Sequence, residues 1–391
     1  MKIVFYCQYV WGMGHLFRTI EFVRALSEHS VTLVAGGPEV DIDLPNHAKL
    51  LRLPALYMDE QFTTLIPGNP AKSLADIQSE RKAMLLDLFE KERPDLFVVE
   101  LFPFGRTKFG FELQPLLQSF GSGRHGNTKS VCSLRDILVE KKHREAYEDR
   151  VLNALKKYFD LLLVHSDERI LPLDKTFSRV KQIPIPMVYT GFIVKQGCPQ
   201  DGEALRHDLK LGNNEKLIVA SAGGGRSGYS LLKSVLNAGR MLKKSLSCRL
   251  EVFSGPFMDD AEFEKLAALS GSGLRVRRFS KRFLDYLYAA DLSVSLAGYN
   301  TCMNLLVTRV PALVYPYRQQ REQPLRLEKF KNFIPLKILQ EKDLEPALLC
   351  RHIKQMLLSP PTCAPGGLNL DGAANSARYL KEWMAGGRAA F

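Results

Sequence analysis

The chain alternates short apolar runs of strand length with longer amphipathic or charged segments, in two successive series. The first six runs are Ile3–Cys7, Val31–Ala35, Lys49–Leu53, Leu96–Glu100, Ser130–Leu134 and Leu161–His165. The second six runs are Leu217–Ala222, Leu250–Ser254, Leu274–Phe279, Leu292–Leu296, Ala312–Pro316 and Leu336–Leu339. Most are apolar on both faces, as buried parallel strands are. The alternation therefore predicts an α/β protein with two doubly wound, Rossmann-like domains.

The length of the chain and its proline and glycine positions predict the domain boundaries. The 391 residues exceed one ordinary domain of roughly 100–200 residues. Prolines, glycines and polar residues cluster at 184–200, so we expect a first domain over 1–190 and a second over 191–372. A Pro/Gly-rich connection at 360–367 precedes a last amphipathic segment, which predicts a C-terminal helix within 373–391.

The charge of the chain is concentrated in its second half. Of the net charge of +12, residues 1–190 hold 25 Lys/Arg against 24 Asp/Glu, and residues 191–391 hold 29 against 18. This excess indicates either an anionic partner or a solvated basic face. No run of about 18 apolar residues occurs, so no transmembrane helix is expected. The seven scattered cysteines, with no C-x-x-C, argue for a reducing compartment and against a zinc site.

The first strand runs directly into the turn Gly12-Met13-Gly14-His15. Glycines between a strand and a helix let a ligand approach the backbone, and the helix N-terminus favours anions. His15 falls in the first helical turn, outside the carboxyl end of the sheet, where open α/β folds bind ligands. An imidazole at this point can act as a general base near neutral pH.

The second series opens on a similar turn, Gly223-Gly224-Gly225-Arg226-Ser227-Gly228. It fits G-x-G-x-x-G, so a nicotinamide dinucleotide is one reading, but that reading needs an acid at the end of the next strand. The next strand has only Glu251, which lies in its middle. We therefore favour a pyrophosphate cradle with Arg226 as a phosphate partner. No Gly-Lys-Ser/Thr follows, which excludes a P-loop.

Two further polar segments follow strands of the second series. The turn Gly298-Tyr299-Asn300-Thr301 offers backbone N–H groups to phosphate and side chains to a sugar. The cluster at 318–326 is dense in arginine, glutamine and glutamate, and it suits hydrogen bonding to sugar hydroxyls.

Three other patterns have weaker functional readings. Arg135-Asp136 follows a strand and forms a candidate pair at the sheet edge. Asp41 and Asp43 match a D-x-D metal pattern, but their spacing is common and no metal is expected. Basic residues at 275–282 could meet phosphates or form a solvated face, and they lack the interleaved aromatics of a nucleic-acid surface, so nucleic acid is not the favoured partner.

The motifs taken together resemble a known family. The stretches at 12–18, 223–228 and 283–316, with Ser133–Asp136 and Arg321–Arg326, resemble two-domain GT-B glycosyltransferases of family 28. The similar branch contains the enzyme that adds N-acetylglucosamine to lipid I, and the nearest resemblance is to a little-characterised bacterial subgroup. The most specific stretch is 283–316, where spacing, glycine turn and following strand agree.

The resemblance implies a metal-independent, inverting transfer from a UDP-linked sugar, with UDP-N-acetylglucosamine among the donors, and no cofactor. The donor would bind mainly the second domain and the acceptor the first, with the glycine turns facing a common gap and the last helix crossing back to the first domain. His15 would act as base with Arg18 beside it. The ligand-binding positions implied are Gly12, Gly14, Gly223, Gly224, Gly225, Arg226, Phe279, Gly298, Tyr299, Asn300, Thr301, Asn304, Glu322 and Gln323.

One departure from the family pattern keeps other functions open. Asn304 stands where relatives place a glutamate that accepts hydrogen bonds from the ribose hydroxyls. A nucleotide-sugar hydrolase or 2-epimerase of the same fold, and a non-catalytic binder of nucleotide-sugars or nucleic acid, are the alternatives. The acceptor is not identified; by analogy it is lipid-linked, and the protein is then cytoplasmic and peripheral at the inner face of the membrane.

Overall fold

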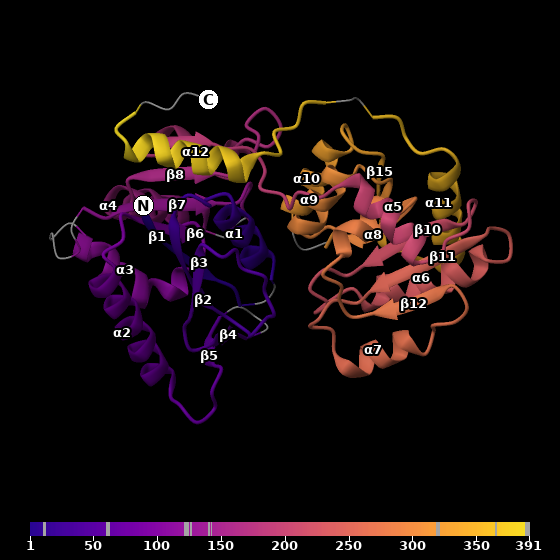
Figure 1. Ribbon diagram of the computed structural model, residues 1–391, viewed down its shortest axis with the longest axis horizontal. Helices are drawn as coiled ribbons and strands as arrows, with labels where there is room; N and C mark the ends of the chain where they lie inside the picture. Colours follow the sequence, from indigo (N-terminus) through magenta and orange to yellow (C-terminus); the bar gives the residue numbers. More distant parts are fainter. Residues whose placement is uncertain are drawn as a thin grey trace. The chain divides into compact units, whose positions relative to one another are not determined.

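The computed structural model describes residues 1–10, 13–59, 63–120, 125, 127–139, 141, 143–317, 321–363 and 366–387. The chain divides into two compact units (Figure 1). The first unit contains residues 1–193 and 368–391, and the second contains residues 194–367. Each unit holds a parallel sheet with helices packed on it, which confirms the predicted α/β class with two Rossmann-like folds.

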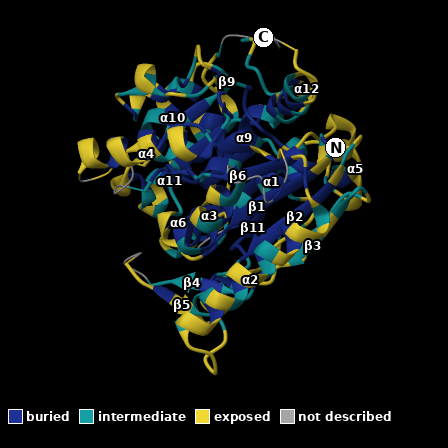
Figure 2. Cartoon of the chain, turned by 90° about the vertical axis from the view of Figure 1, so that its left-hand side faces the viewer, coloured by how far each residue is buried: buried dark blue, intermediate teal, exposed yellow. Residues whose placement is uncertain are grey.

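The first unit contains a sheet of seven parallel strands in the order β3-β2-β1-β6-β7-β8-β9. Their bounds are β1 Lys2–Gln8, β2 Ser30–Gly36, β3 Ala48–Arg52, β6 Leu96–Glu100, β7 Lys129–Leu134, β8 Leu161–Val164 and β9 Met187–Tyr189. Between β3 and β6 in the sequence, β4 (Leu56–Met58) and β5 (Leu65–Pro67) pair antiparallel and form a separate two-stranded sheet. The interior strands are buried along their length (Figure 2), as their continuous apolar sequences predict.

The helices of the first unit cover the two faces of its sheet. They are α1 Gly14–Arg24, α2 Leu74–Glu92, α3 Gly110–Phe120, α4 Arg144–Tyr158 and α12 Gly372–Met384, with 3₁₀ turns η1 Thr107–Phe109, η2 Leu173–Lys175 and η3 Val180–Gln182. Alternate residues of β1 point to opposite cores. Ile3 and Phe5 pack with α1 and α12, whereas Val4 and Tyr6 pack with α2, α3 and α4.

The second unit contains a sheet of six parallel strands in the order β12-β11-β10-β13-β14-β15. The strands are β10 Lys216–Ser221, β11 Cys248–Phe253, β12 Leu274–Arg277, β13 Leu292–Leu296, β14 Ala312–Tyr315 and β15 Leu336–Ile338. The helices are α5 Pro199–Asp208, α6 Tyr229–Leu242, α7 Asp260–Ala267, α8 Phe283–Ala289, α9 Tyr299–Thr308, α10 Glu322–Phe330 and α11 Pro346–Leu358, with the 3₁₀ turn η4 Glu341–Leu344.

Each sheet reverses its strand order once, and this reversal positions the candidate sites. In the first unit the chain moves outward from β1 to β3 on one side and from β6 to β9 on the other, so β1 and β6 flank the switch point. In the second unit β10 and β13 flank it. Open α/β sheets bind ligands outside the carboxyl ends of such strands. His15 follows β1, and the glycine turns follow β10 and β13.

The twelve strands predicted from the sequence are all present, with ends that agree to within about two residues. The sequence reading missed β4, β5 and β9, because each is only three residues long and lacks a long apolar run. The prediction that strands are buried on both faces fails for β3 and β12. These two lie at sheet edges, where one side is exposed to solvent.

A buried ion pair joins the sheet of the first unit to α2 and α3. The Arg81 guanidinium donates from Nε and Nη2 to both carboxylate oxygens of Glu112, at 2.9 and 2.6 Å. Tyr6 of β1 also donates to Glu112, and Gln8 Oε1 accepts from Arg81 at 2.7 Å. Neither member of the pair is exposed, and the charges are matched and hydrogen-bonded.

We expect Arg81→Met to destabilise the protein by about 3–5 kcal/mol, because it leaves the Glu112 carboxylate buried without its counter-ion. Urea unfolding followed by circular dichroism measures this loss. Lys82→Met is the matched control: Lys82 is exposed on the same helix, and its replacement should change stability by less than about 0.5 kcal/mol. Equal effects of the two substitutions would contradict the assignment.

Candidate functional site

His15 lies in the first turn of α1, directly beyond the end of β1. The helix starts at Gly14 with Met13 as N-cap, and no side chain caps it. The His15 side chain is about one-fifth exposed, so the ring is largely enclosed while one edge stays accessible. This position agrees with the place that the glycine turn predicted for it. Gly12, the other glycine predicted to bind ligand here, lies outside the described residues.

Glu100, the last residue of β6, holds the His15 ring. His15 Nδ1 lies 2.7 Å from Glu100 Oε1. An ionised carboxylate only accepts hydrogen bonds, so Nδ1 of the neutral ring must carry the proton and donate it. The other nitrogen, Nε2, then keeps its lone pair and can accept a proton. The pairing of β1 with β6 brings together two residues that are 85 positions apart in the chain.

Arg18 lies one turn after His15 on α1 and also binds Glu100. Its Nη2 donates to Oε1, the same oxygen that accepts from His15. Both Arg18 and Glu100 are almost fully buried, so Arg18 cannot contact a substrate from this position. In this position Arg18 holds the carboxylate that orients the His15 ring. Glu100 Oε2 makes no hydrogen bond among the described residues.

The electrostatics of the pair keep the His15 imidazole unprotonated and the Glu100 carboxylate charged. Burial lowers the pKa of His15 to about 4, and Glu100 opposes this shift while Arg106 and Arg18 add to it. Burial alone would raise the pKa of Glu100, but His15, Arg18 and Arg106 hold it at about 2. At neutral pH His15 is therefore a neutral imidazole beside an ionised carboxylate.

The glycine turn of the second unit has a backbone that favours glycine. Gly223, Gly225 and Gly228 have φ of 62°, 93° and 112°, which side chains rarely adopt. A Cβ on Gly225 would lie 2.5 Å from Ser254 O, so this glycine also permits close packing against the end of β11. In contrast, a Cβ on Gly224 would meet only Phe257, at 3.9 Å. Gly224 therefore faces open space.

Two helices start at the switch point of the second unit without side-chain caps. Gly228 is the N-cap of α6 and Gly298 is the N-cap of α9. A Cβ on Gly223 would lie 4.0 Å from Thr301 Oγ1, so the turn after β10 lies next to the first turn of α9. Uncapped helix N-termini present backbone N–H groups and a positive dipole end, a favourable site for phosphate.

The remaining predicted ligand positions of α9 and α10 differ in exposure. Asn304 is partly exposed one turn into α9, whereas Tyr299 is buried with the Arg326 guanidinium 5.5 Å from its ring centre. Glu322 and Gln323 start α10 and are both buried. Gln323 Oε1 accepts from Tyr317 N at 2.9 Å. Glu322 Oε2 is buried and makes no hydrogen bond among the described residues, so it can accept one from a ligand hydroxyl.

Several other predicted residues lie around the strand ends of the two sheets. Arg226 is exposed with its guanidinium 5.5 Å from the Phe257 ring centre, and Phe279 is 46% exposed after β12. Asn300 is partly exposed beside Tyr299. Residues 318–320 of the polar cluster lie outside the described residues. Asp43, of the D-x-D pair, is exposed and pairs with Arg24.

The basic run at 275–282 is largely neutralised by carboxylates of its own unit. Arg277 pairs with the buried Glu251 at 3.0 Å, Arg278 pairs with Asp260, and Arg282 pairs with Asp208 and Asp285. These ion pairs explain the run by local charge balance, so the phosphate-binding reading of these three arginines is not supported.

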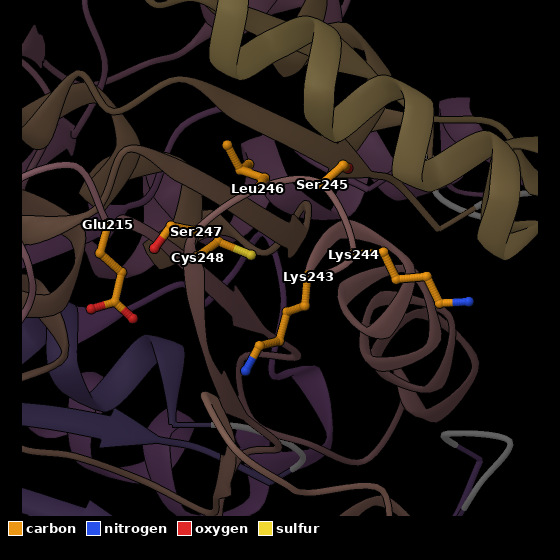
Figure 3. A pocket seen from close by; sticks show the side chains of 7 residues that line it. All are labelled: Glu215, Lys243, Lys244, Ser245, Leu246, Ser247 and Cys248. Atoms are coloured by element: carbon orange, nitrogen blue, oxygen red, sulfur yellow. The ribbon is translucent and has the colours of Figure 1, made fainter.

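Two cavities in the described residues lie away from these strand ends. One of about 300 Å³ is lined by Glu215, Lys243, Lys244, Ser245, Leu246, Ser247 and Cys248 (Figure 3). Another of about 550 Å³ is lined by Leu117, Phe120, and residues 127–130 and 156–160. Both lie near the amino ends of strands, the edge opposite to the switch points. We therefore assign the candidate site from the strand ends.

Within the described ranges no three His, Cys, Asp or Glu side chains gather into a metal site. In the same ranges no helix is both long enough and apolar enough to cross a membrane.

The second half of the chain matches a known family. Residues 223–376 match the glycosyltransferase family 28 C-terminal domain. The match includes both glycine turns, Asn304, Glu322 and Gln323. Among curated proteins, no sequence matches the chain.

Solved structures share the fold over nearly the whole chain. The calicheamicin glycosyltransferase CalG4 has a TM-score of 0.59 at 14% identity, covering 98% of this chain and 97% of its own. Phytolacca americana UGT2, complexed with UDP-2fluoro-glucose and pterostilbene, has 0.57 at 15%, covering 98% and 94%. Acinetobacter baumannii MurG has 0.53 at 12%, covering 99% and 100%. The GT-B fold expected from the sequence is confirmed.

The sequence reading missed Glu100. It was assigned to the end of a buried strand, and an acid at that place is a weak signal by itself. A stronger signal is that Glu100 ends one strand of the first series and His15 follows another, so both residues lie at the carboxyl ends of strands. Only the adjacency of β1 and β6 makes the two residues partners.

We expect Glu100→Gln to lower the pKa of His15 below its value of about 4, because the substitution removes the carboxylate that stabilises the imidazolium. Histidine NMR resonances followed against pH measure the shift, and ¹⁵N shifts report the tautomer. Glu21→Gln on α1 is the matched control, since Glu21 pairs with Arg24 and should leave the His15 titration unchanged. An unaltered midpoint in Glu100→Gln would contradict the pairing.

Proposed function

We propose that this protein transfers a sugar from a nucleotide-sugar donor to an acceptor hydroxyl, with His15 as the general base. The observation that carries the proposal is the His15–Glu100 pair at the switch point of the first unit, in a chain that carries a family 28 domain. The neutral ring, the fixed Nδ1 proton and the partly exposed edge are what a base needs.

The donor binds the second unit in this proposal. Its diphosphate lies against the uncapped starts of α6 and α9, where Gly223, Gly224 and Gly298 leave the backbone accessible. Glu322 accepts a hydrogen bond from one sugar hydroxyl, Gln323 donates one from its amide nitrogen to another, and Asn304 accepts one from the ribose. Phe279 and Tyr299 flank the nucleotide. UDP is the proposed nucleotide because a solved neighbour of the same fold holds a UDP-sugar.

The proposed reaction is a single displacement that uses groups of both units. His15 Nε2 takes the proton of the acceptor hydroxyl as the acceptor oxygen forms its bond to the anomeric carbon. The bond from that carbon to the diphosphate oxygen breaks on the opposite side, so the configuration inverts. Glu100 stabilises the imidazolium that forms, and the helix N-termini stabilise the negative charge on the departing diphosphate. Arg18 keeps Glu100 ionised and oriented.

A hydrolase or 2-epimerase is the second candidate, since the same pair can activate water. The two are separated by products: transfer needs an acceptor, whereas hydrolysis releases free sugar at full rate without one. A protein that binds UDP-sugars but turns none over would be the non-catalytic binder.

We expect His15→Ala to lower turnover of a UDP-sugar at least about 100-fold while UDP binding is retained, because only the base is lost. His143→Ala, an exposed histidine of the same unit, should keep full activity. Wild-type kcat/KM should fall as pH drops through about 4, the pKa of His15, and stay level through 6.5. A decline centred near 6.5, or unchanged turnover in His15→Ala, would sink the assignment.

We expect Gly224→Ala to weaken UDP binding about tenfold or more while leaving the unfolding midpoint unchanged. Its added methyl would meet only Phe257, at 3.9 Å, in the protein, but would occupy the space where the diphosphate approaches the backbone. Calorimetric titration with UDP measures the affinity. Gly271→Ala is the control, because its methyl would meet nothing within 4 Å and it lies beside the amino end of β12. Equal UDP affinities in both variants would argue against the cradle.

A further inference from the structure

Arg106 has a backbone conformation that an arginine rarely adopts. Its φ is 57°, in the left-handed region, and Leu101, earlier in the same loop, has φ of 67°. The loop is held firmly on both sides of Arg106: Phe104 and Phe109 are buried, and Phe104 O accepts from Tyr147 Oη at 2.8 Å. Strained residues that the surrounding structure fixes in this way are concentrated at functional sites.

The Arg106 guanidinium has no protein partner in the described residues. No hydrogen bond or ion pair joins it to another side chain, and its Nε is buried without an acceptor. Yet it lies close enough to His15 and Glu100 to lower the pKa of each. A largely enclosed cation without an acceptor is unfavourable, and an oxyanion that binds it removes this penalty.

Arg135 brings a second guanidinium to the same edge of the sheet. It follows β7, the neighbour of β6, and the backbone there is joined by the bond from Leu101 N to Ser133 O at 2.9 Å. Asp136, fully buried, accepts from Arg135 Nε at 3.0 Å and orients the side chain. Burial lowers the pKa of Arg106, and the nearby charge of Arg135 lowers it further. Arg135 therefore adds a second, oriented guanidinium whose charge acts on Arg106.

The charges at this corner do not cancel. Arg18, Arg106 and Arg135 are positive, whereas Glu100 and Asp136 are negative, and His15 is neutral at pH 7. One positive charge is left over among these side chains. Planar guanidinium forks match the oxygens of phosphate and carboxylate groups.

We infer that Arg106 and Arg135 bind an oxyanion, a phosphate or a carboxylate, carried by the acceptor next to the hydroxyl that His15 deprotonates. This inference rests on the proposed function and narrows its acceptor to anionic molecules. Arg106 and Arg135 are binding residues in it, and the sugar and nucleotide contacts of the second unit are not involved.

Titration of the full-length protein with inorganic phosphate tests the inference. Saturating UDP is added first, so that the diphosphate cradle of the second unit is occupied, and ³²P-orthophosphate binding is measured by equilibrium dialysis. We expect one phosphate site in the wild type and at least tenfold weaker binding in Arg106→Gln and in Arg135→Gln, because each loses charge-assisted hydrogen bonds. Arg106→Lys should retain part of the affinity. Competition by acetate distinguishes a carboxylate site from a phosphate site.

Lys108→Gln is the matched control, since Lys108 is exposed in η1, two residues from Arg106, and loses the same charge. Phosphate affinity equal to wild type in both arginine variants would overturn the inference and leave Arg106 as a counter-charge for Glu100. The UDP titration that precedes the phosphate step tests the proposed function independently. Failure to bind UDP would therefore be seen separately from failure to bind phosphate. Unfolding midpoints verify that each variant is folded.

Discussion

The hydrogen bonds that the Glu100 carboxylate accepts are the interaction on which the candidate site of the first unit depends. One of its oxygens accepts from both His15 and Arg18, and burial excludes water that would compete for it. The carboxylate fixes the ring and its tautomer, while burial keeps the ring neutral. Arg18 in turn keeps the carboxylate ionised despite that burial. Loss of Arg18 or Glu100 leaves the charge of the other buried without its partner, and loss of Glu100 also removes the acceptor that holds the His15 ring.

The two units use the same topology for different chemistry. At the switch point of the first unit, ionisable side chains lie at the strand ends and can move a proton. At the switch point of the second unit, glycines remove side chains and leave the backbone of two helix starts exposed to a ligand. This division fits a reaction in which one partner is deprotonated and the other leaves as a diphosphate.

The net positive charge of a segment does not by itself locate an anion-binding site. The segment 275–282 is rich in basic residues, yet three of its arginines are paired with carboxylates of neighbouring elements. Arg106 lies in the half that is nearly neutral overall, and no ion pair of its guanidinium occurs among the described residues. Net charge counts residues, whereas binding depends on which of them lack a counter-ion.

The sequence by itself determined the class of fold, the twelve strands of the two predicted series and the glycine turns, because these depend on local periodicity and on residues with special backbone freedom. It also placed His15 at the start of a helix. Only the tertiary structure decided that Glu100 is its partner, that Arg18 is buried behind it, and that Arg106 makes no ion pair among the described residues. Those relations depend on which strands become neighbours, and strand order follows from long-range packing that no local pattern encodes.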